Sequence, residues 1–354
     1  MPTRVRILAA ATAAWLALGC PAVPAKNLAR SPAQTPPSSV LAAIQQRGTV
    51  RCGVTYSPGF AANDASGRPV GFMVDLCRAL AAAVLGNAEA IELRRMSKPQ
   101  EFIALEGGDI DVSFAQTSWT FPRDATYRID FGPPVFHDQQ GVAAWPRDDG
   151  RPPLQGGGVT VCVPAATTSH RTLEEYVART GQPWQIRQYP TWPDALQAFI
   201  GKECAAISTD HSLLTAALRA PDFPKPGAEI APLPVPAREP VAPVTANADR
   251  TWVGVVRWTM FALMLAEEKG VTADNAAILS TTGGSEVQRL LQGIPDVAER
   301  VGLRADWAYQ AITQVGNYGE IFDRNIGDRS PYRLPRGPNR PWSRGGLLYA
   351  PVFQ

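Results

Sequence analysis

The stretch ALEGGDIDVSFAQTS, residues 104–118, returns in altered form as AFIGKECAAISTDHS, residues 198–212. Each copy reads as the end of a helix, a short turn, a strand and a polar loop. Aligning the two copies places Gln116 opposite Asp210 and leaves the same order of elements on either side. The repetition predicts two lobes that are built on one plan.

Strand and helix patterns alternate around both copies. The expected strands are residues 49–54, 90–96 and 109–115 in the first half and 159–163, 185–190 and 204–208 in the second. The expected helices are residues 73–85 and 97–108, then 170–179 and 193–201. Alternation of this kind is typical of parallel sheets with helices on both faces, so the predicted fold class is α/β. A strongly amphipathic helix at 251–270 is expected to pack on the first lobe.

The composition describes an ordinary globular chain that is long enough for two domains. The chain has 354 residues, of which 45% are hydrophobic and 19% are charged, and its formal net charge is +2. This charge gives no electrostatic basis for binding nucleic acid or an anionic membrane. There is no CxxC pair and no cysteine–histidine ladder, so neither a metal site nor another cofactor is predicted.

The N-terminus has the pattern of an export signal. Two arginines precede the apolar residues 7–18, and small residues with two prolines follow. We expect the signal to comprise residues 1–25, and a polar tether rich in proline and serine to comprise residues 26–40. If the signal is removed, we expect the mature protein to be periplasmic. Cys20, which follows small residues, offers the alternative of a lipid anchor.

Three polar loops follow predicted strands and are expected to meet in a cleft between the lobes. In open parallel sheets, ligands lie at the carboxyl ends of strands. The loops are residues 117–124, 164–170 and 208–212. Arg123 lies in the first of them, and its guanidinium offers a planar pair of donors that matches the two oxygens of a carboxylate. We therefore predict a pocket that holds a carboxylate.

Each of these residues also has a plainer interpretation. Arg123 can be a solvated charge on a loop, because most arginines lie at the surface. Thr167, Thr168 and Asp210 can each be the N-cap of a following helix. For each residue taken alone, the plainer interpretation stays open. The three loops together favour a binding site, because they are expected to converge in one cleft.

Several motifs run along the chain: RCGV and PGF (51–60), GFMVDLCRALAAAV (71–84), FIALEGGDIDV (102–112), TSWTFPRD (117–124), ATTS (166–169), STDHS (208–212), REPVAPV (238–244), VVRWTMFALMLAEEKG (255–270) and WAYQAITQVGNYGEIFDRN (307–325). In these motifs, nearly the whole chain from Leu41 onward resembles the periplasmic amino-acid-binding proteins of ABC transporters. The resemblance is strongest to the general L-amino-acid-binding branch of bacterial extracellular solute-binding protein family 3. It implies a two-lobed periplasmic-binding-protein fold of type II, in which each lobe is a parallel-dominated sheet flanked by helices.

The resemblance also implies domain boundaries. Residues 41–142 form the first part of lobe 1, residues 143–242 form lobe 2, and residues 243–354 return to lobe 1 and end in a C-terminal extension. Two crossovers, near 140–145 and 239–247, are expected to act as hinges.

Site roles carry over position by position as expectations. Arg123 corresponds to the arginine that clamps the α-carboxylate of the ligand, with Ser118 as its neighbour in that role. Thr167 and Thr168 stand before the first helix of lobe 2, where free N–H groups and the helix dipole favour an anion. Asp210 corresponds to the aspartate that holds the α-ammonium group.

Further residues complete the expected pocket. Gln116 is placed to assist in holding the ammonium group. Phe60, helped by Tyr56, resembles the aromatic wall over the aliphatic part of the ligand. Trp119 is a weaker candidate for lining the cleft, because a single tryptophan is more often packed than functional.

The sequence departs from the family pattern at two places. Met73 replaces the usual acidic residue after GF and leaves Asp75 as the acidic residue of the motif. Ala165 and Ala166 stand where a Gln-Gly pair is common before the threonines. Glycine allows a close approach of the backbone to a ligand, so the alanines are expected to reshape the grip on the carboxylate.

The implied function is capture of L-amino acids by a monomer that closes its lobes and delivers the ligand to a membrane ABC permease. An exported enzyme on the same scaffold, similar to a cyclohexadienyl dehydratase, is the main alternative, and a ligand-sensing module is another. An enzyme would need a positioned acid or base besides Asp210. Glu101, Glu106 and His211 are the candidates for that role.

Four cysteines remain after removal of the signal, and an even number in an exported chain favours disulfides. We expect Cys52–Cys77 and Cys162–Cys204, each within one lobe, because a bridge across the lobes would obstruct closure. The alternative is four buried free thiols.

Overall fold

The computed structural model describes residues 39–148, 150, 152–154, 158–224, 227–231 and 238–353. The predicted export signal at 1–25, with Cys20, and nearly all of the predicted tether lie outside the described residues. No helix in the described part of the chain is both long enough and apolar enough to cross a membrane.

The strands and helices predicted for the two halves of the chain are present in the predicted order, and further elements lie between and after them. The helices are α1 (Val40–Arg47), α2 (Phe72–Leu85), α3 (Lys98–Glu106), α4 (Phe121–Thr126), α5 (Thr168–Thr180), α6 (Trp192–Ile200), α7 (His211–Arg219), α8 (Arg250–Glu268), α9 (Ala276–Thr282), α10 (Ser285–Gln292), α11 (Pro295–Arg300), α12 (Trp307–Val315) and α13 (Tyr318–Asn325). The strands are β1 (Val50–Val54), β2 (Ala62–Asn63), β3 (Pro69–Val70), β4 (Ile91–Arg95), β5 (Val112–Ser118), β6 (Ile129–Phe131), β7 (Phe136–Ala144), β8 (Thr160–Pro164), β9 (Gln185–Tyr189), β10 (Ala206–Asp210), β11 (Glu229–Ala231) and β12 (Arg238–Ala246). Two short 3₁₀ turns, Gly337–Asn339 and Trp342–Arg344, follow α13.

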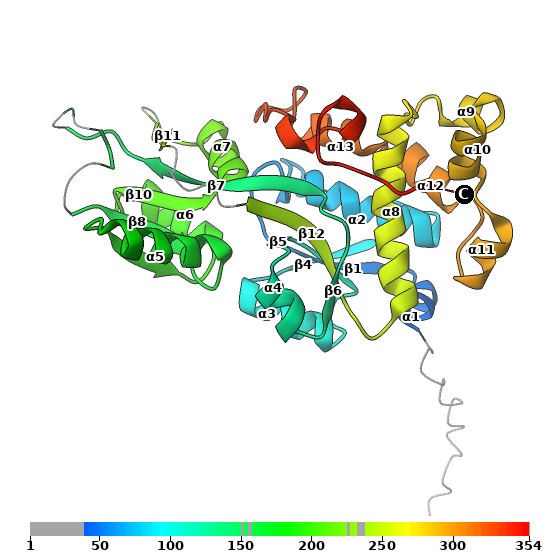
Figure 1. The fold of residues 1–354 in the computed structure, drawn as a ribbon, viewed down its shortest axis with the longest axis horizontal. Coiled ribbons are helices and arrows are strands. Elements are labelled where there is room, and N and C mark those ends of the chain that lie inside the picture. The colour runs from blue at the N-terminus through cyan, green and yellow to red at the C-terminus, as the bar shows by residue number, and fades with distance from the viewer. Residues whose placement is uncertain are drawn as a thin grey trace, which may run out of the picture. The chain divides into compact units, whose positions relative to one another are not determined.

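Each lobe is built on a parallel trio of strands. In lobe 1, β1 pairs in parallel with β4 and β5, and in lobe 2, β8 pairs in parallel with β9 and β10. An antiparallel strand completes each trio, because β12 pairs with β5 and β7 pairs with β10. The same plan therefore occurs twice, as the repeated sequence predicted, and Figure 1 shows helices α5, α6 and α7 around the second sheet.

The strands β7 and β12 connect the two lobes. Residues 136–139 of β7 pair with residues 238–241 of β12, and Figure 1 shows the two strands side by side between the lobes. Beyond this crossing, β7 joins the sheet of lobe 2 and β12 joins the sheet of lobe 1. The predicted hinge ranges, 140–145 and 239–247, thus begin at the crossing and extend into the sheets.

The loop predicted at 117–124 is partly wrong. β5 runs on through Ser118, and Arg123 lies in the short helix α4, which Thr120 precedes as the N-cap residue and which has Pro122 in its first turn. Proline is well tolerated there, because the first helical N–H groups have no partner within the helix. The helix places the guanidinium back toward the end of β5.

The four cysteines form the two disulfides that were expected. Cys52 in β1 is joined to Cys77 in α2, and Cys162 in β8 is joined to Cys204 just before β10. Each disulfide begins in the first strand of its lobe and stays within that lobe, so neither restrains one lobe against the other.

The C-terminal extension packs against both lobes. Asn339 bonds to the backbone N–H and C=O of His137 in β7, and Arg336 forms a double hydrogen bond with the buried carboxylate of Glu267. From lobe 2, Arg219 in α7 donates to the backbone carbonyls of Tyr332 and Arg333. The extension therefore contacts the crossing and the helix that follows β10.

Candidate functional site

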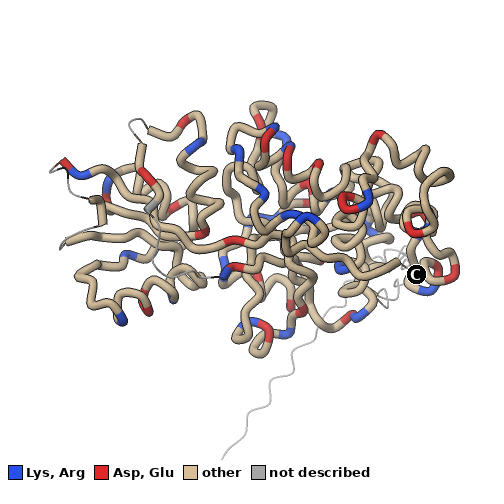
Figure 2. Tube along the Cα trace, turned by 45° about the horizontal axis from the view of Figure 1, so that its top comes forward, with Lys and Arg blue, Asp and Glu red and all other residues tan. Residues whose placement is uncertain are grey.

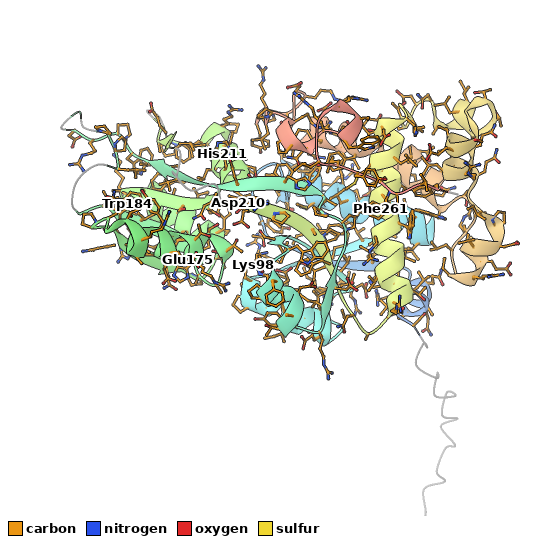
Figure 3. The ribbon with its side chains drawn as sticks, in the orientation of Figure 1. Lys98, Glu175, Trp184, Asp210, His211 and Phe261 are labelled. Atoms are coloured by element: carbon orange, nitrogen blue, oxygen red, sulfur yellow. A yellow bond between two sulfur atoms is a disulfide. The ribbon has the colours of Figure 1, made fainter. Side chains whose placement is uncertain are left out.

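A polar cavity of about 60 Å³ lies between the lobes, at the carboxyl ends of their parallel strands. From lobe 1 it is lined by Thr55, Met96, Ser97, Lys98, Ala115, Gln116, Ser118 and Arg123. From lobe 2 it is lined by Pro164, Ala165, Thr167, Thr168, Ser169, Pro190, Thr191, Trp192, Thr209, Asp210 and Leu213. Figure 3 shows Lys98 and Asp210 on facing sides of this region. The three predicted loops do converge here.

A larger cavity of about 440 Å³ lies between α8, α10, α11 and α12. Its lining is mostly apolar and includes Trp258, Trp307 and Phe353. None of the predicted site residues lines it. The small polar cavity, where charged groups from two lobes meet, is therefore the candidate site.

Arg123 supplies a partly buried positive charge to the cavity. One of its terminal nitrogens, Nη1, donates to the carbonyl of Ser118 at 2.9 Å, which orients the guanidinium. Burial lowers the pKa of Arg123, while nearby carboxylates, among them Glu101 and Glu239, act in the opposite sense. The guanidinium stays protonated at any ordinary pH. No described residue forms an ion pair with it.

Asp210 supplies a buried negative charge from the other lobe. Although it stands in the N-cap position of α7, its side chain makes no capping hydrogen bond. Its carboxylate accepts one long hydrogen bond, from Ser169 Oγ at 3.5 Å. Burial, together with the charges of Glu239 and Asp138, raises the pKa of Asp210 well above its usual value. The capping interpretation therefore does not hold for this side chain.

Lys98, a cavity residue that was not predicted, forms an ion pair with Glu101, which is fully buried and was considered above as an acid or base. Lys98 Nζ lies 3.1 Å from Glu101 and also donates to Ala115 O and Thr117 Oγ1. Burial lowers the pKa of Lys98. Burial would raise the pKa of Glu101, but the Lys98 charge and hydroxyl donors outweigh it and hold that pKa below its usual value. Each charge of this pair thus already has a partner.

Lys98 could have been found from its place in the topology. It follows β4 directly and is the first residue of α3, so it lies at the carboxyl end of a parallel strand. Ligands lie at the carboxyl ends of parallel strands, and this rule, which selected the other loops, also selects Lys98.

The two threonines of lobe 2 differ in what their hydroxyls do. Thr167 accepts from His170 N and donates to Pro164 O, so its side chain caps α5 as the plainer interpretation expected. Thr168 Oγ1 instead donates to Glu239 at 2.9 Å. Thr168 and Ser169, the first two residues of α5, line the cavity, and a helix leaves their N–H groups without a partner in its own backbone.

Gln116 lines the cavity, as predicted, and adopts an unusual backbone conformation. Its φ of +56° lies in the left-handed region, and its side-chain oxygen accepts from Ser57 Oγ at 3.1 Å. Strained backbone of this kind in a non-glycine residue is found preferentially at functional sites.

The aromatic residues proposed for the pocket are not brought to it. Phe60 is only 1% exposed and packs edge to face against Phe72 and Phe136 in the core of lobe 1. Tyr56 lies beneath the guanidinium of Arg95, and Trp119 stacks on Phe131. The structure instead places Trp192, the first residue of α6, in the lining.

The residues considered for acid–base chemistry do not meet in the cavity. Glu106 is exposed and accepts from the backbone N–H of Arg128. His211 does not line the cavity, and burial lowers its pKa, so it is neutral at pH 7. Glu101 lies behind Lys98. In the described part of the chain, no group of three or more metal-ligating side chains comes together.

Met73 and Asp75 serve the core of lobe 1 rather than the cleft. Met73 is buried in α2. Asp75 accepts from Arg78 on its own helix and from Arg324 and Asn325 on α13. The acidic residue of this motif therefore joins α2 to the C-terminal helices.

Two lobes joined by two crossing strands, with opposite charges facing one polar cavity, define a two-lobed solute-binding protein. Residues 50–327 match the family model of bacterial extracellular solute-binding proteins, family 3, and the chain belongs to that family. The expected type II periplasmic-binding-protein fold is confirmed.

Three relatives show how far the similarity extends. The general L-amino acid-binding periplasmic protein AapJ of Rhizobium johnstonii is 35% identical over 321 residues, which are 89% of this chain and 92% of the relative. The glutamate/glutamine/aspartate/asparagine-binding protein BztA of Rhodobacter capsulatus is 35% identical over 90% of this chain and 94% of the relative. A periplasmic binding protein of an ABC transporter from Brucella ovis, solved with glutathione bound, has a TM-score of 0.83 and 32% identity, covering 90% of this chain and all of that one.

Ala166 stands in a backbone conformation that favours glycine, with φ of +58°. The left-handed conformation costs an alanine roughly 1–2 kcal/mol, whereas added chain entropy from a glycine costs about 0.4–1 kcal/mol. We expect Ala166→Gly to leave the free energy of unfolding unchanged or raise it by up to about 1.6 kcal/mol. Urea unfolding measures this. Ala165→Gly, at a position without positive φ, is the matched control and should destabilise.

Proposed function

We propose that this protein captures L-amino acids outside the cytoplasm and delivers them to a membrane ABC permease by closing its two lobes. The observation that carries the proposal is a pair of opposite charges at the cavity that have no ion-pair partner among the described residues: the partly buried Arg123 on lobe 1 and the buried Asp210 on lobe 2. An amino acid carries a carboxylate and an ammonium group one carbon apart, and so can neutralise both. Burying either charge without a partner is costly, which makes the zwitterion the natural ligand.

In this proposal, Arg123 and the first N–H groups of α5 hold the α-carboxylate, and Asp210 holds the α-ammonium with Gln116 beside it. Ser118, Thr167 and Thr168 complete the shell. Phe60 is left out of the ligand contacts because it is buried in the core. The domain boundaries expected at 142–143 and 242–243 place one half of the site on each lobe.

The names of the relatives support the ligand class and the compartment. Two of them are amino-acid-binding proteins, and the third was solved with glutathione, which itself carries an amino acid end. We therefore place the protein in the periplasm, as a monomer that is exported by its N-terminal segment. The charges of the described residues are interspersed along the trace (Figure 2), which gives no support for a nucleic-acid partner.

We favour binding over catalysis because, among the described residues, the cavity lining holds only one other acid or base besides Asp210 and Arg123, which is Lys98. Lys98 and Glu101 neutralise each other. Capture needs no bond to break, and the energy of contacts made from both lobes is enough to favour closure.

A thermal-shift screen over the amino acids and glutathione tests the function. A ligand at one hundred times its dissociation constant should raise the free energy of unfolding by about 2.7 kcal/mol. Recovery of the ligand unchanged, by mass spectrometry, separates a binding protein from an enzyme. If no amino acid or amino-acid peptide raises the melting temperature, the proposal is wrong.

Arg123→Ala should abolish or strongly weaken amino acid binding without unfolding the protein. The ligand carboxylate loses a bidentate and partly desolvated partner, which costs roughly 2–5 kcal/mol of binding free energy. Arg123→Lys should recover only part of the affinity, because an ammonium group cannot reproduce the planar fork. Calorimetry on the three proteins measures the effect. Wild-type affinity in Arg123→Ala would favour the interpretation as a solvated charge.

Amino acid binding should strengthen as the pH rises through the raised pKa of Asp210. Below that pKa the carboxyl is protonated, so binding an ammonium must release a proton, and affinity falls by up to about tenfold per pH unit. Glu239 and Asp138 face Asp210 and raise its pKa, while Lys98 and Arg123 lower it. Calorimetry in buffers of different ionisation enthalpy counts the released proton.

Asp210→Asn is the matched variant for this pH dependence. It should bind amino acids weakly and with a flatter pH profile, but bind α-keto acids nearly as well as the wild type. The free energy of unfolding of the ligand-free protein changes with pH in the opposite direction. The raised pKa of Asp210 stabilises the fold at pH values below the usual pKa of an aspartate, and this contribution is lost as the pH rises. An unchanged pH profile in Asp210→Asn would count against the assignment.

A further inference from the structure

Glu239 lies in β12 where that strand crosses β7, and its carboxylate joins the two lobes. Ser118 Oγ, at the end of β5 in lobe 1, donates to its Oε2 atom. Thr168 Oγ1, at the start of α5 in lobe 2, donates to the same oxygen at 2.9 Å. Glu239 is only 2% exposed, and it lies behind the two hydroxyls rather than in the cavity lining.

This arrangement determines what the two hydroxyls can offer to a ligand. A hydroxyl group has one proton to donate and two lone pairs to accept with, whereas an ionised carboxylate only accepts. Once Ser118 and Thr168 have given their protons to Glu239, they present only lone pairs to the cavity. Such hydroxyls can accept from an ammonium group, but they cannot donate to a carboxylate or a ketone.

We propose that Glu239 is a specificity-determining residue that makes the cleft select an amino group next to the ligand carboxylate. This inference rests on the proposed function. It also revises the roles of Ser118 and Thr168, because their hydroxyls accept from the ligand ammonium and leave the carboxylate to Arg123 and the N–H groups of α5. An α-keto acid places an acceptor where the amino acid has a donor, and is therefore rejected by both hydroxyls.

The charge of Glu239 has a separate effect that must be distinguished from this one. Glu239 and Asp138 both raise the pKa of Asp210, and they stand opposite each other across the β7–β12 pairing. Removing either charge favours the ionised form of Asp210 and so strengthens amino acid binding. Loss of the negative charge therefore increases the affinity for an amino acid relative to its keto acid. Release of a hydroxyl proton decreases that relative affinity.

Glu239→Gln is the test variant. A glutamine accepts from one hydroxyl but donates to the other, so one hydroxyl regains a proton that it can donate to a ligand. We expect the ratio of the keto acid to the amino acid dissociation constant to lie on the order of tenfold below the ratio in Asp138→Asn, which removes a charge but frees no hydroxyl; this is the value of one hydrogen bond to a charged or buried group. The probes are an amino acid selected in the thermal-shift screen and its matched α-keto acid, measured by calorimetry at one pH.

Asp138→Asn is the matched control. Asp138 accepts from Ser212 on the lobe 2 side of the crossing, and it has no bond to Ser118 or Thr168. Its removal should leave the ratio unchanged or raise it. A ratio in Glu239→Gln as high as the ratio in Asp138→Asn would overturn the proposal.

A measurement without ligand separates this inference from the proposed function. Because Glu239 contacts both lobes, Glu239→Ala should increase the radius of gyration in small-angle X-ray scattering, while circular dichroism confirms that the variant is folded. An unchanged radius would show that the carboxylate does not hold the lobes together. If the wild type binds neither probe, the proposed function is wrong and the specificity role falls with it, whatever the scattering shows.

Discussion

The free-energy cost of burying a charge explains how the charged side chains between the two lobes are paired. An isolated ion in a protein interior is strongly unfavourable unless another charge or several hydrogen bonds compensate for it. Lys98 and Glu101 meet this requirement through each other. Glu239 meets it through two hydroxyl donors. In the described part of the chain, Arg123 donates to a backbone carbonyl and Asp210 accepts one long hydrogen bond, so a ligand that carries both charges can compensate for each of them.

The crossing of β7 and β12 brings these groups together. Glu239 and Asp138 are direct neighbours across the two strands, and Asp210 pairs with Gln140 just beyond the crossing. These acidic groups therefore lie where the chain passes from one lobe to the other. The C-terminal extension adds a second connection between the lobes. Its Asn339 bonds to His137 in β7, and its Tyr332 carbonyl accepts from Arg219 in α7. Closure and ligand recognition are therefore linked through the same few strands.

Much of the fold follows from local sequence patterns. The parallel trios, the helices between them and the two disulfides were predictable, because alternating hydrophobic periods and an even number of exported cysteines are short-range features. Arg123 and Asp210 were also found as cavity residues, since a residue after a buried strand lies at the carboxyl end of a sheet. The polar start of β7, FHDQQ, does not read as a strand, because its side chains lie at the crossing instead of in a sheet core.

The sequence by itself determined the fold class, the duplication, the cysteine pairing and the two charges that a zwitterion would neutralise. Only the tertiary structure decided which hydroxyl groups can still donate a proton to a ligand. Ser118, Thr168 and Glu239 are separated by 50 residues or more along the chain, and no periodicity indicates that their side chains meet. Phe60 likewise reads as a pocket wall but packs in the core, against Phe72 of α2 and Phe136 of β7. A side chain's hydrogen-bond partners depend on long-range packing, and that packing is what local sequence cannot specify.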